Sequence, residues 1–92
     1  MNNTLSLCIP RVDNAITKQY IESVINKYKF GKLKKIKFIR NRKKNNNIVY
    51  IYFNYWYNND YTKNIKKKIL NNESIHLFYD EPWFWTLVLN TN

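Results

Sequence analysis

The segment that decides the fold is residues 48–56, which runs Ile48-Val49-Tyr50-Ile51-Tyr52-Phe53-Asn54-Tyr55-Trp56. Every residue in it except Asn54 is β-branched or aromatic, and these residue types favour a β-strand. The run is apolar on both of its alternating faces, so both faces of this strand must be either packed or used for binding. Asn58 and Asn59 follow and end the pattern.

Two more strands are predicted on the N-terminal side. Residues 33–40 alternate apolar with basic side chains, as a strand with one solvent-exposed face does. The polar residues 41–47 form the turn that joins it to residues 48–56. Residues 4–12 begin with an alternating pattern that Pro10 is expected to end, which predicts a short first strand.

A helix is predicted between those two strands. Apolar residues recur at helical spacing from Asn14 to Tyr28, with Asp13 or Asn14 as the N-cap. Gly31 is the only glycine of the chain and follows this pattern, so we expect it to be the left-handed C-cap of the helix.

The C-terminal half predicts a second helix and two strands. Asp60 is the expected N-cap of the helix, and its apolar stripe contains Tyr61, Ile65, Ile69 and Leu70. Residues 74–79 and 83–90 are extended stretches joined by the turn 80–82. In the last stretch the better core set is Trp85, Leu87 and Leu89, and core or edge packing is also expected for Trp56 and Trp83.

This order predicts an α+β fold. β-α-β-β-α-β in about 90 residues suits a ferredoxin-like sandwich, in which a four-stranded antiparallel sheet carries both helices on one face. Residues 74–79 are expected to form an extra short strand before the last strand of this order. Because no internal repeat or linker is visible, residues 1–92 are expected to form a single domain.

The formal charge of +10 is concentrated in one part of the chain. Asn, Lys, Ile, Tyr and Phe dominate the composition, which a strongly A/T-biased genome would produce whatever the function. The window 27–44, however, holds ten basic residues and no acid, and elsewhere six basic and six acidic residues cancel. This distribution favours an anionic partner more than the total charge does.

Other features indicate the class of protein. The chain contains one cysteine, has no basic segment before its first apolar stretch, and has no apolar run of the roughly 20 residues that span a bilayer. We therefore expect an intracellular protein of a reducing compartment, without a membrane partner. Cys8 and His76 lie on different predicted strands, and neither a nucleophile motif, a phosphate loop nor a metal-ligand spacing is present. An enzyme, a cofactor, a metal site and a small-molecule substrate are therefore not expected.

Short motifs at residues 7–12, 28–33 and 46–53 carry a resemblance that extends over nearly the whole chain. The family that the chain resembles is the RNA recognition motif (RRM). The family's hexamer matches residues 7–12, its octamer matches residues 46–53, and residues 28–33 look like its helix-to-strand junction. The ending Asp80-Glu81-Pro82-Trp83-Phe84-Trp85 resembles that of small RRM-like proteins of large DNA viruses, which implies a host-cell cytoplasm or a virion. Of the family's three stacking positions, occupied here by Cys8, Ile48 and Tyr50, only Tyr50 is aromatic.

Period-two alternation predicts which residues share the open sheet face. If Val49, Ile51 and Phe53 face the helices, the open face carries Ile48, Tyr50 and Tyr52, and the neighbouring strands add side chains of Cys8, Lys35, Lys37, Ile39, Phe84, Thr86 and Val88. The candidate nucleic-acid-binding residues are Tyr50, Tyr52 and Phe84 for base stacking and Arg11, Lys35, Lys37, Arg40, Arg42, Lys43 and Lys44 for phosphates.

Two functions stay open at this point. The first is non-catalytic binding of single-stranded RNA or DNA. The second is a protein-protein or virion-structural interface, including a homodimer, that uses the aliphatic part of the same face. Lys63–Lys68 is expected to be a solvated helix face under either interpretation.

Overall fold

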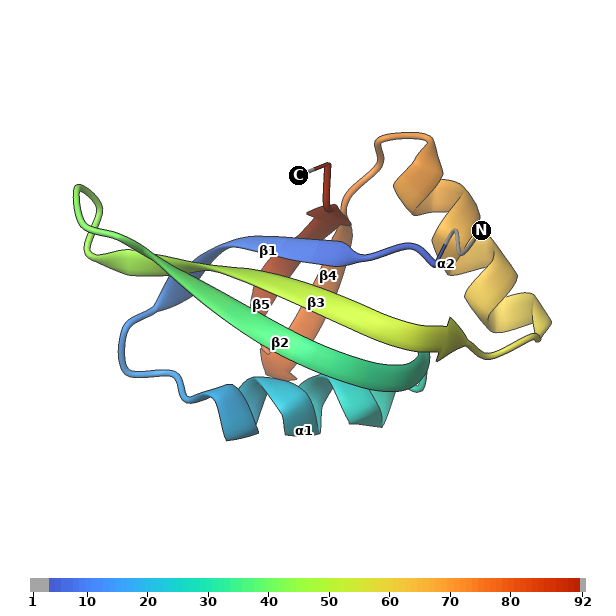
Figure 1. Cartoon of the computed structure of the whole chain (residues 1–92), viewed down its shortest axis with the longest axis horizontal. Helices are drawn as coiled ribbons and strands as arrows, with labels where there is room; N and C mark the ends of the chain where they lie inside the picture. Colours follow the sequence, from blue (N-terminus) through green and yellow to red (C-terminus); the bar gives the residue numbers. More distant parts are fainter. Residues whose placement is uncertain (1–3, 92) are drawn as a thin grey trace.

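The computed structural model describes residues 4–91 of the chain. Its order of elements agrees with the predicted alternation of strands and helices, ending in two strands (Figure 1). The elements are β1 (Leu7–Asp13), α1 (Lys18–Tyr28), β2 (Gly31–Asn41), β3 (Asn46–Trp56), α2 (Asp60–Leu70), β4 (Ile75–Asp80) and β5 (Trp83–Leu89).

The sheet has five antiparallel strands in the order β2-β3-β1-β5-β4. The predicted sheet of four strands was therefore one strand too small. β4 pairs along β5 from Ile75 opposite Leu87 to Asp80 opposite Trp83 and forms an edge of the same sheet. It joins because its alternate residues, with Leu77 fully buried, continue the apolar face of β5.

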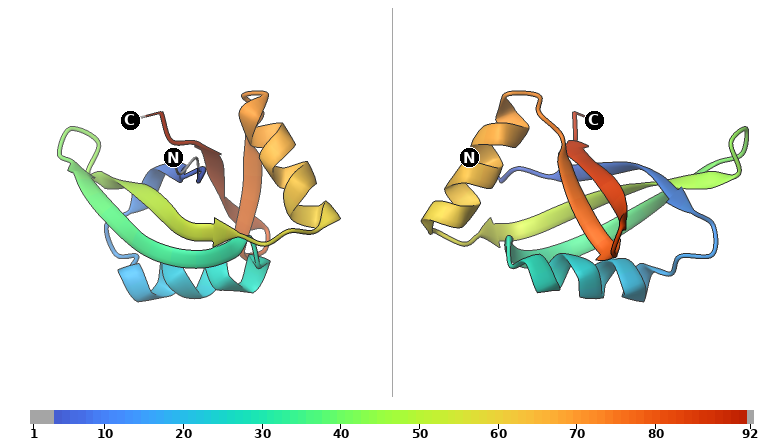
Figure 2. Two further views of the ribbon diagram at one scale, coloured as in Figure 1. Left: turned by 45° about the vertical axis from the view of Figure 1, so that its right-hand side comes forward. Right: turned by 180° about the vertical axis from the view of Figure 1, so that it is seen from behind.

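One hydrophobic core lies between the inward sheet face and the helices. α1 contributes Ile21, Val24 and Ile25 to it, and α2 contributes Ile69. α1 lies along the β2 side of the sheet, and α2 packs against the β4–β5 hairpin, which crosses the other three strands steeply (Figures 1 and 2). The sheet residues of this core are Leu7, Ile9, Val12, Ile36, Val49, Ile51, Phe53, Leu77, Trp85 and Leu87.

Pro10 does not end β1. The strand continues to Asp13 because a bulge lies between Ile9, which pairs with Val49, and Val12, which pairs with Asn47. One extra residue on β1 leaves Pro10 and Arg11 together on the exposed surface, and Val12 returns to the core. A proline is compatible with a strand at such a bulge, because no ladder hydrogen bond is required from it there.

Gly31 is not the C-cap of α1. The left-handed residue is Lys29, at φ 56°, and its N–H donates to the carbonyl of Asn26. Gly31 begins β2 and meets the end of β3, where an added Cβ would collide with the Tyr55 carbonyl oxygen and lie 2.7 Å from the Trp56 Cα. A close approach of two backbones therefore explains this glycine.

The N-caps of both helices lie near the predicted positions but are other residues. Thr17 caps α1 by accepting from the Tyr20 N–H at 3.1 Å, whereas the Asp13 carboxylate accepts from the Ala15 N–H. Asn59 caps α2 and forms a reciprocal capping box with Thr62, which is fully buried.

Several predicted core residues are more exposed than expected. In the α2 stripe Ile69 is buried, but Tyr61 is 45% and Leu70 56% exposed, because the helix is rotated to bury Thr62. Trp85 is in the core, whereas Trp83 is 63% exposed beside the β4–β5 turn, against the expectation of core or edge packing. Among residues 4–91, no helix is long and apolar enough to cross a membrane.

Candidate functional site

The sheet face opposite the core carries the predicted mixture of aromatic, aliphatic and basic side chains. β3 alternates as predicted, so Val49, Ile51 and Phe53 face the core and the intervening side chains lie on the other face. The ladder extends this face across the sheet: Tyr52 pairs with Lys35, Tyr50 with Lys37 and Cys8, Ile48 with Ile39, and Cys8 with Val88.

The two candidate stacking tyrosines of β3 differ in accessibility. Tyr50 is only 9% exposed, so most of its ring is closed to a ligand in this conformation. Tyr52 is half-buried, and the Lys35 ammonium lies 5.1 Å from the centre of its ring, within the range of a cation–π contact. Tyr52 is therefore the more accessible of the two tyrosine rings, and it has a cation beside it. It does not occupy one of the three stacking positions that the RRM resemblance implies.

The basic turn stands at the end of a projecting hairpin (Figure 1). Arg42, Lys43 and Lys44 are all exposed in the turn between β2 and β3. The residue that shapes the turn is Asn45, at φ 53°, whose side-chain oxygen accepts from the Asn14 amide at 2.7 Å. The turn is thereby tied to the loop between β1 and α1 rather than held by its own backbone alone.

Arg40 lies apart from the other basic candidates of β2. Alternation places it on the side of Ile36 and Phe38, opposite to Lys35 and Lys37. Its guanidinium donates to the Asn45 side-chain oxygen at 3.3 Å. Arg40 therefore supports the turn from the other face, although it remains exposed.

The β1 bulge brings Arg11 to Phe84. Two open hollows of about 320 and 340 Å³ adjoin there, and Arg11, Phe84 and Trp85 line both. Lys44 reaches the second hollow from the β2–β3 turn, and the Asp13 carboxylate also lines it. Three of the residues predicted from sequence, Arg11, Lys44 and Phe84, therefore meet although they belong to three different parts of the chain.

Two exposed side chains beside Phe84 were missed at the sequence level. The His76 ring stacks on Phe84 with centroids 3.9 Å apart and 19° between the planes. Phe78 meets Phe84 at 5.4 Å in a T-shaped contact and is 39% exposed. Both lie at alternate positions of β4, so alternation would have placed them outward had residues 74–79 been assigned to this sheet.

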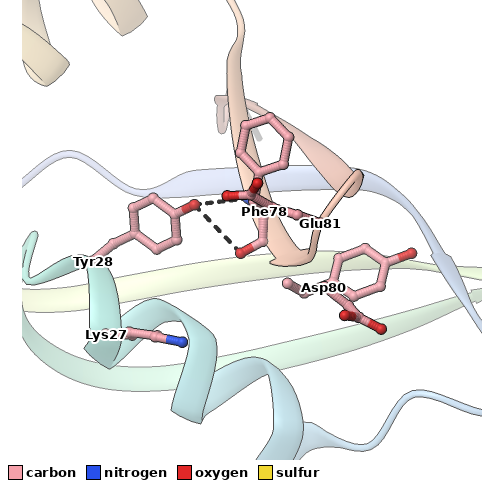
Figure 3. A pocket seen from close by; sticks show the side chains of 6 residues that line it. Lys27, Tyr28, Phe78, Asp80 and Glu81 are labelled. Carbon is pink, nitrogen blue, oxygen red and sulfur yellow. Dashed lines mark hydrogen bonds between the residues drawn. The ribbon is translucent and has the colours of Figure 1, made fainter.

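A larger hollow lies on the helix side of β4. It measures about 410 Å³ and is lined by Lys27, Tyr28, Phe78, Tyr79, Asp80 and Glu81 (Figure 3). The Tyr28 hydroxyl accepts from the Phe78 N–H at 2.8 Å and donates to the Phe78 carbonyl at 3.3 Å. These bonds occupy the backbone groups of the β4 edge at Phe78, so another strand cannot pair there. The remaining lining combines one cation with two carboxylates and favours no one class of ligand.

Cys8 carries the thiol of the chain and lies on this sheet face. Burial raises the pKa of the half-buried Cys8 thiol, which lowers its thiolate fraction and makes it a poorer nucleophile. Within residues 4–91, no group of three or more His, Cys, Asp or Glu side chains is placed to hold a metal ion.

Comparisons with known proteins returned no significant match to a protein-family model, a curated protein or a solved structure. The function is therefore inferred from the chemistry of the chain's own side chains.

Proposed function

We propose that this protein is an RRM-like, non-catalytic domain that binds single-stranded nucleic acid, with RNA as the expected ligand and DNA as the alternative. The strand order β2-β3-β1-β5 supports a ferredoxin-like arrangement with β4 added at the edge. The hexamer and octamer segments lie on β1 and β3, which are neighbours in the sheet. This adjacency is what the RRM resemblance requires.

The observation that carries the proposal is the pairing of aromatic rings with cations on one sheet face. Tyr52 has the Lys35 ammonium above its ring, and Phe84 shares a hollow with Arg11 and Lys44. Bases stack on aromatic rings at about 1 to 3 kcal/mol each, while the cations beside them neutralise the phosphates that connect the bases. Neither requirement depends on a particular base sequence, so we expect low sequence selectivity.

The basic turn adds an electrostatic contribution. Lys35, Lys37, Arg42, Lys43 and Lys44 belong to the window that holds ten basic residues and no acid. β2 is an edge strand, and lysines on an edge also prevent pairing with other chains, so the charge of β2 has two possible roles. Arg42, Lys43 and Lys44 lie in the turn rather than on the edge, which favours a ligand as the reason for their charge.

A salt titration of oligonucleotide binding tests the proposal. Each neutralised phosphate of a single strand contributes about 0.7 to the slope of log K against log salt concentration. Replacing Arg42, Lys43 and Lys44 with Gln should therefore reduce the slope by about 2. In the matched control, Gln likewise replaces Lys63, Lys67 and Lys68, which are exposed on α2. This control variant loses the same net charge as the turn variant.

The proposal predicts a large effect of the turn variant and a small effect of the α2 variant, measured by fluorescence anisotropy with labelled oligo(U) and oligo(dT). Equal losses in both variants would indicate nonspecific charge attraction. A wild-type protein that does not bind at low salt would refute nucleic-acid binding altogether.

A protein-protein interface is the second candidate, and one feature favours it. Ile39 is 38% exposed and pairs with the half-buried Ile48, which leaves aliphatic surface on the same face. A self-associating domain should sediment as a dimer that Ile48→Glu dissociates. A monomer across the concentration range would count against a homodimer.

A further inference from the structure

The β4–β5 hairpin carries an exposed aromatic cluster formed by His76, Phe78 and Phe84. His76 and Phe84 are stacked in near-parallel planes at 3.9 Å, and Phe78 closes one side at 5.4 Å. Phe78 and Phe84 nevertheless remain 39% and 42% exposed. Two partly exposed phenylalanines in mutual contact form an apolar surface that a small domain does not need for its own core.

The register places this cluster on the same side of the sheet as the proposed binding face. Phe78 pairs with Phe84, and His76 pairs with Thr86, so all of these side chains alternate away from the buried Leu77 and Trp85. Val88 on β5 pairs with Cys8 on β1, which connects the cluster to the face of β3. The aromatic face therefore extends across β1 and β5 to the edge strand β4.

Positive charge lies next to the cluster. The hollow of about 340 Å³ is lined by Phe84, Arg11 and Lys44, and the Asp13 carboxylate lines it as well. Two cations against one carboxylate leave an excess of positive charge there, which complements the phosphate of a bound nucleotide.

The stacking positions that the RRM resemblance implies at the centre of the sheet offer little accessible ring. Tyr50 is 9% exposed, and the other stacking positions implied by the RRM resemblance are Cys8 and Ile48. A base needs an accessible ring face, so Phe84 and Phe78 provide what the central strands have lost.

We infer that the single strand continues from Tyr52 across the sheet to the β4–β5 hairpin, where one base adds to the His76–Phe84 stack and another lies against Phe78. Arg11 and Lys44 hold the phosphates of these nucleotides. This inference rests on the proposed function and assigns His76 and Phe78 to binding. It adds a stacking site on the edge hairpin to the one at Tyr52 on β3.

Alanine substitutions of the two new residues test the inference. His76→Ala and Phe78→Ala should each weaken binding of labelled oligo(U) by roughly 5- to 150-fold, the range that corresponds to the loss of one stacked base. The matched control is Tyr57→Ala, because Tyr57 is 40% exposed and has one aromatic neighbour, Tyr55, near the far end of β3. Its affinity should stay within about twofold of the wild type.

The outcomes separate the inference from the proposed function. If the wild type binds with a steep salt dependence but His76→Ala and Phe78→Ala bind equally well, the hairpin site is wrong and the proposed function stands. If the wild type does not bind, both fail.

Circular dichroism checks that the variants fold, and photo-crosslinking of the wild type to iodouracil-substituted oligo(U) provides a test without substitutions. Crosslinks within residues 75–86 support the hairpin site. Crosslinks confined to β3 overturn it.

Discussion

Replacing Gly31 with alanine should destabilise the domain by steric conflict and not by loss of a helix cap. The alanine Cβ would lie 2.7 Å from the Trp56 Cα, whereas an ordinary contact of a Cβ is 3.4–4 Å. The ends of β2 and β3 must therefore separate by roughly 1 Å, which also strains the hydrogen bond from the Tyr57 N–H to the Phe30 carbonyl. Overpacking costs about 1 to 3 kcal/mol and a weakened hydrogen bond about 1 kcal/mol, and the reduced freedom of the unfolded chain returns somewhat less than 1 kcal/mol.

The expected result is a loss of about 2 kcal/mol in the free energy of unfolding, measured by urea denaturation with tryptophan fluorescence. Lys29→Gly is the paired variant, because Lys29 occupies the left-handed position after α1. Relief of its backbone strain should exceed the flexibility cost of a glycine and stabilise the domain by about 0.5 to 1 kcal/mol. Wild-type stability of Gly31→Ala, or destabilisation by Lys29→Gly, would refute this reasoning.

Three further predictions concern the sheet face and α2. Tyr50→Ala should lower the melting temperature more than Tyr52→Ala does, because Tyr50 is the more buried of the two side chains. Tyr52→Ala should weaken oligonucleotide binding more than Tyr50→Ala does, because the Tyr52 ring is the more accessible. Parallel melting and anisotropy curves check both comparisons. Thr62→Val should cost about 1 to 3 kcal/mol in urea unfolding, since the Thr62 hydroxyl is buried and donates to the Tyr57 carbonyl, whereas the exposed Thr86→Val should change stability by less than about 0.5 kcal/mol. Cys8 should react with iodoacetamide more slowly in the folded than in the urea-unfolded protein at pH 8, because its raised pKa keeps the thiol protonated. Equal reactivity in both states would contradict the shift. Because the pKa of the thiol is higher in the folded state, the stability that the protonated thiol contributes is complete below the unfolded pKa and is lost as pH rises through the folded pKa.

The elements of the fold follow closely from local patterns. The run from Ile48 to Trp56 becomes β3, and the alternation of Lys35 and Lys37 with apolar neighbours becomes β2. These predictions hold because side chains alternate across any strand, whatever it pairs with. The helix positions also follow, but their caps shift by a few residues, because a Thr or Asn nearby can serve as well as an Asp.

The candidate site could be predicted only in part. Alternation placed Tyr52, Lys35 and Lys37 on one face and Arg40 on the other, but it could not show that Tyr50 is nearly closed off or that the Arg40 guanidinium donates to the Asn45 side chain. The bulge at Pro10 and Arg11 changes the phase of β1, and a pattern that assumes unbroken alternation misses such a change.

The sequence by itself determined the class of elements, their order, the two faces of the central strands and the position of the excess charge, because each of these depends on residues that are close along the chain. Only the tertiary structure decided the pairing of β4 at the edge, the close approach that requires Gly31, and the meeting of Arg11, Lys44 and Phe84 beside His76 and Phe78. These features join residues that are distant in sequence. The register of the sheet and the packing of the shared core set them, and a local pattern carries no record of either.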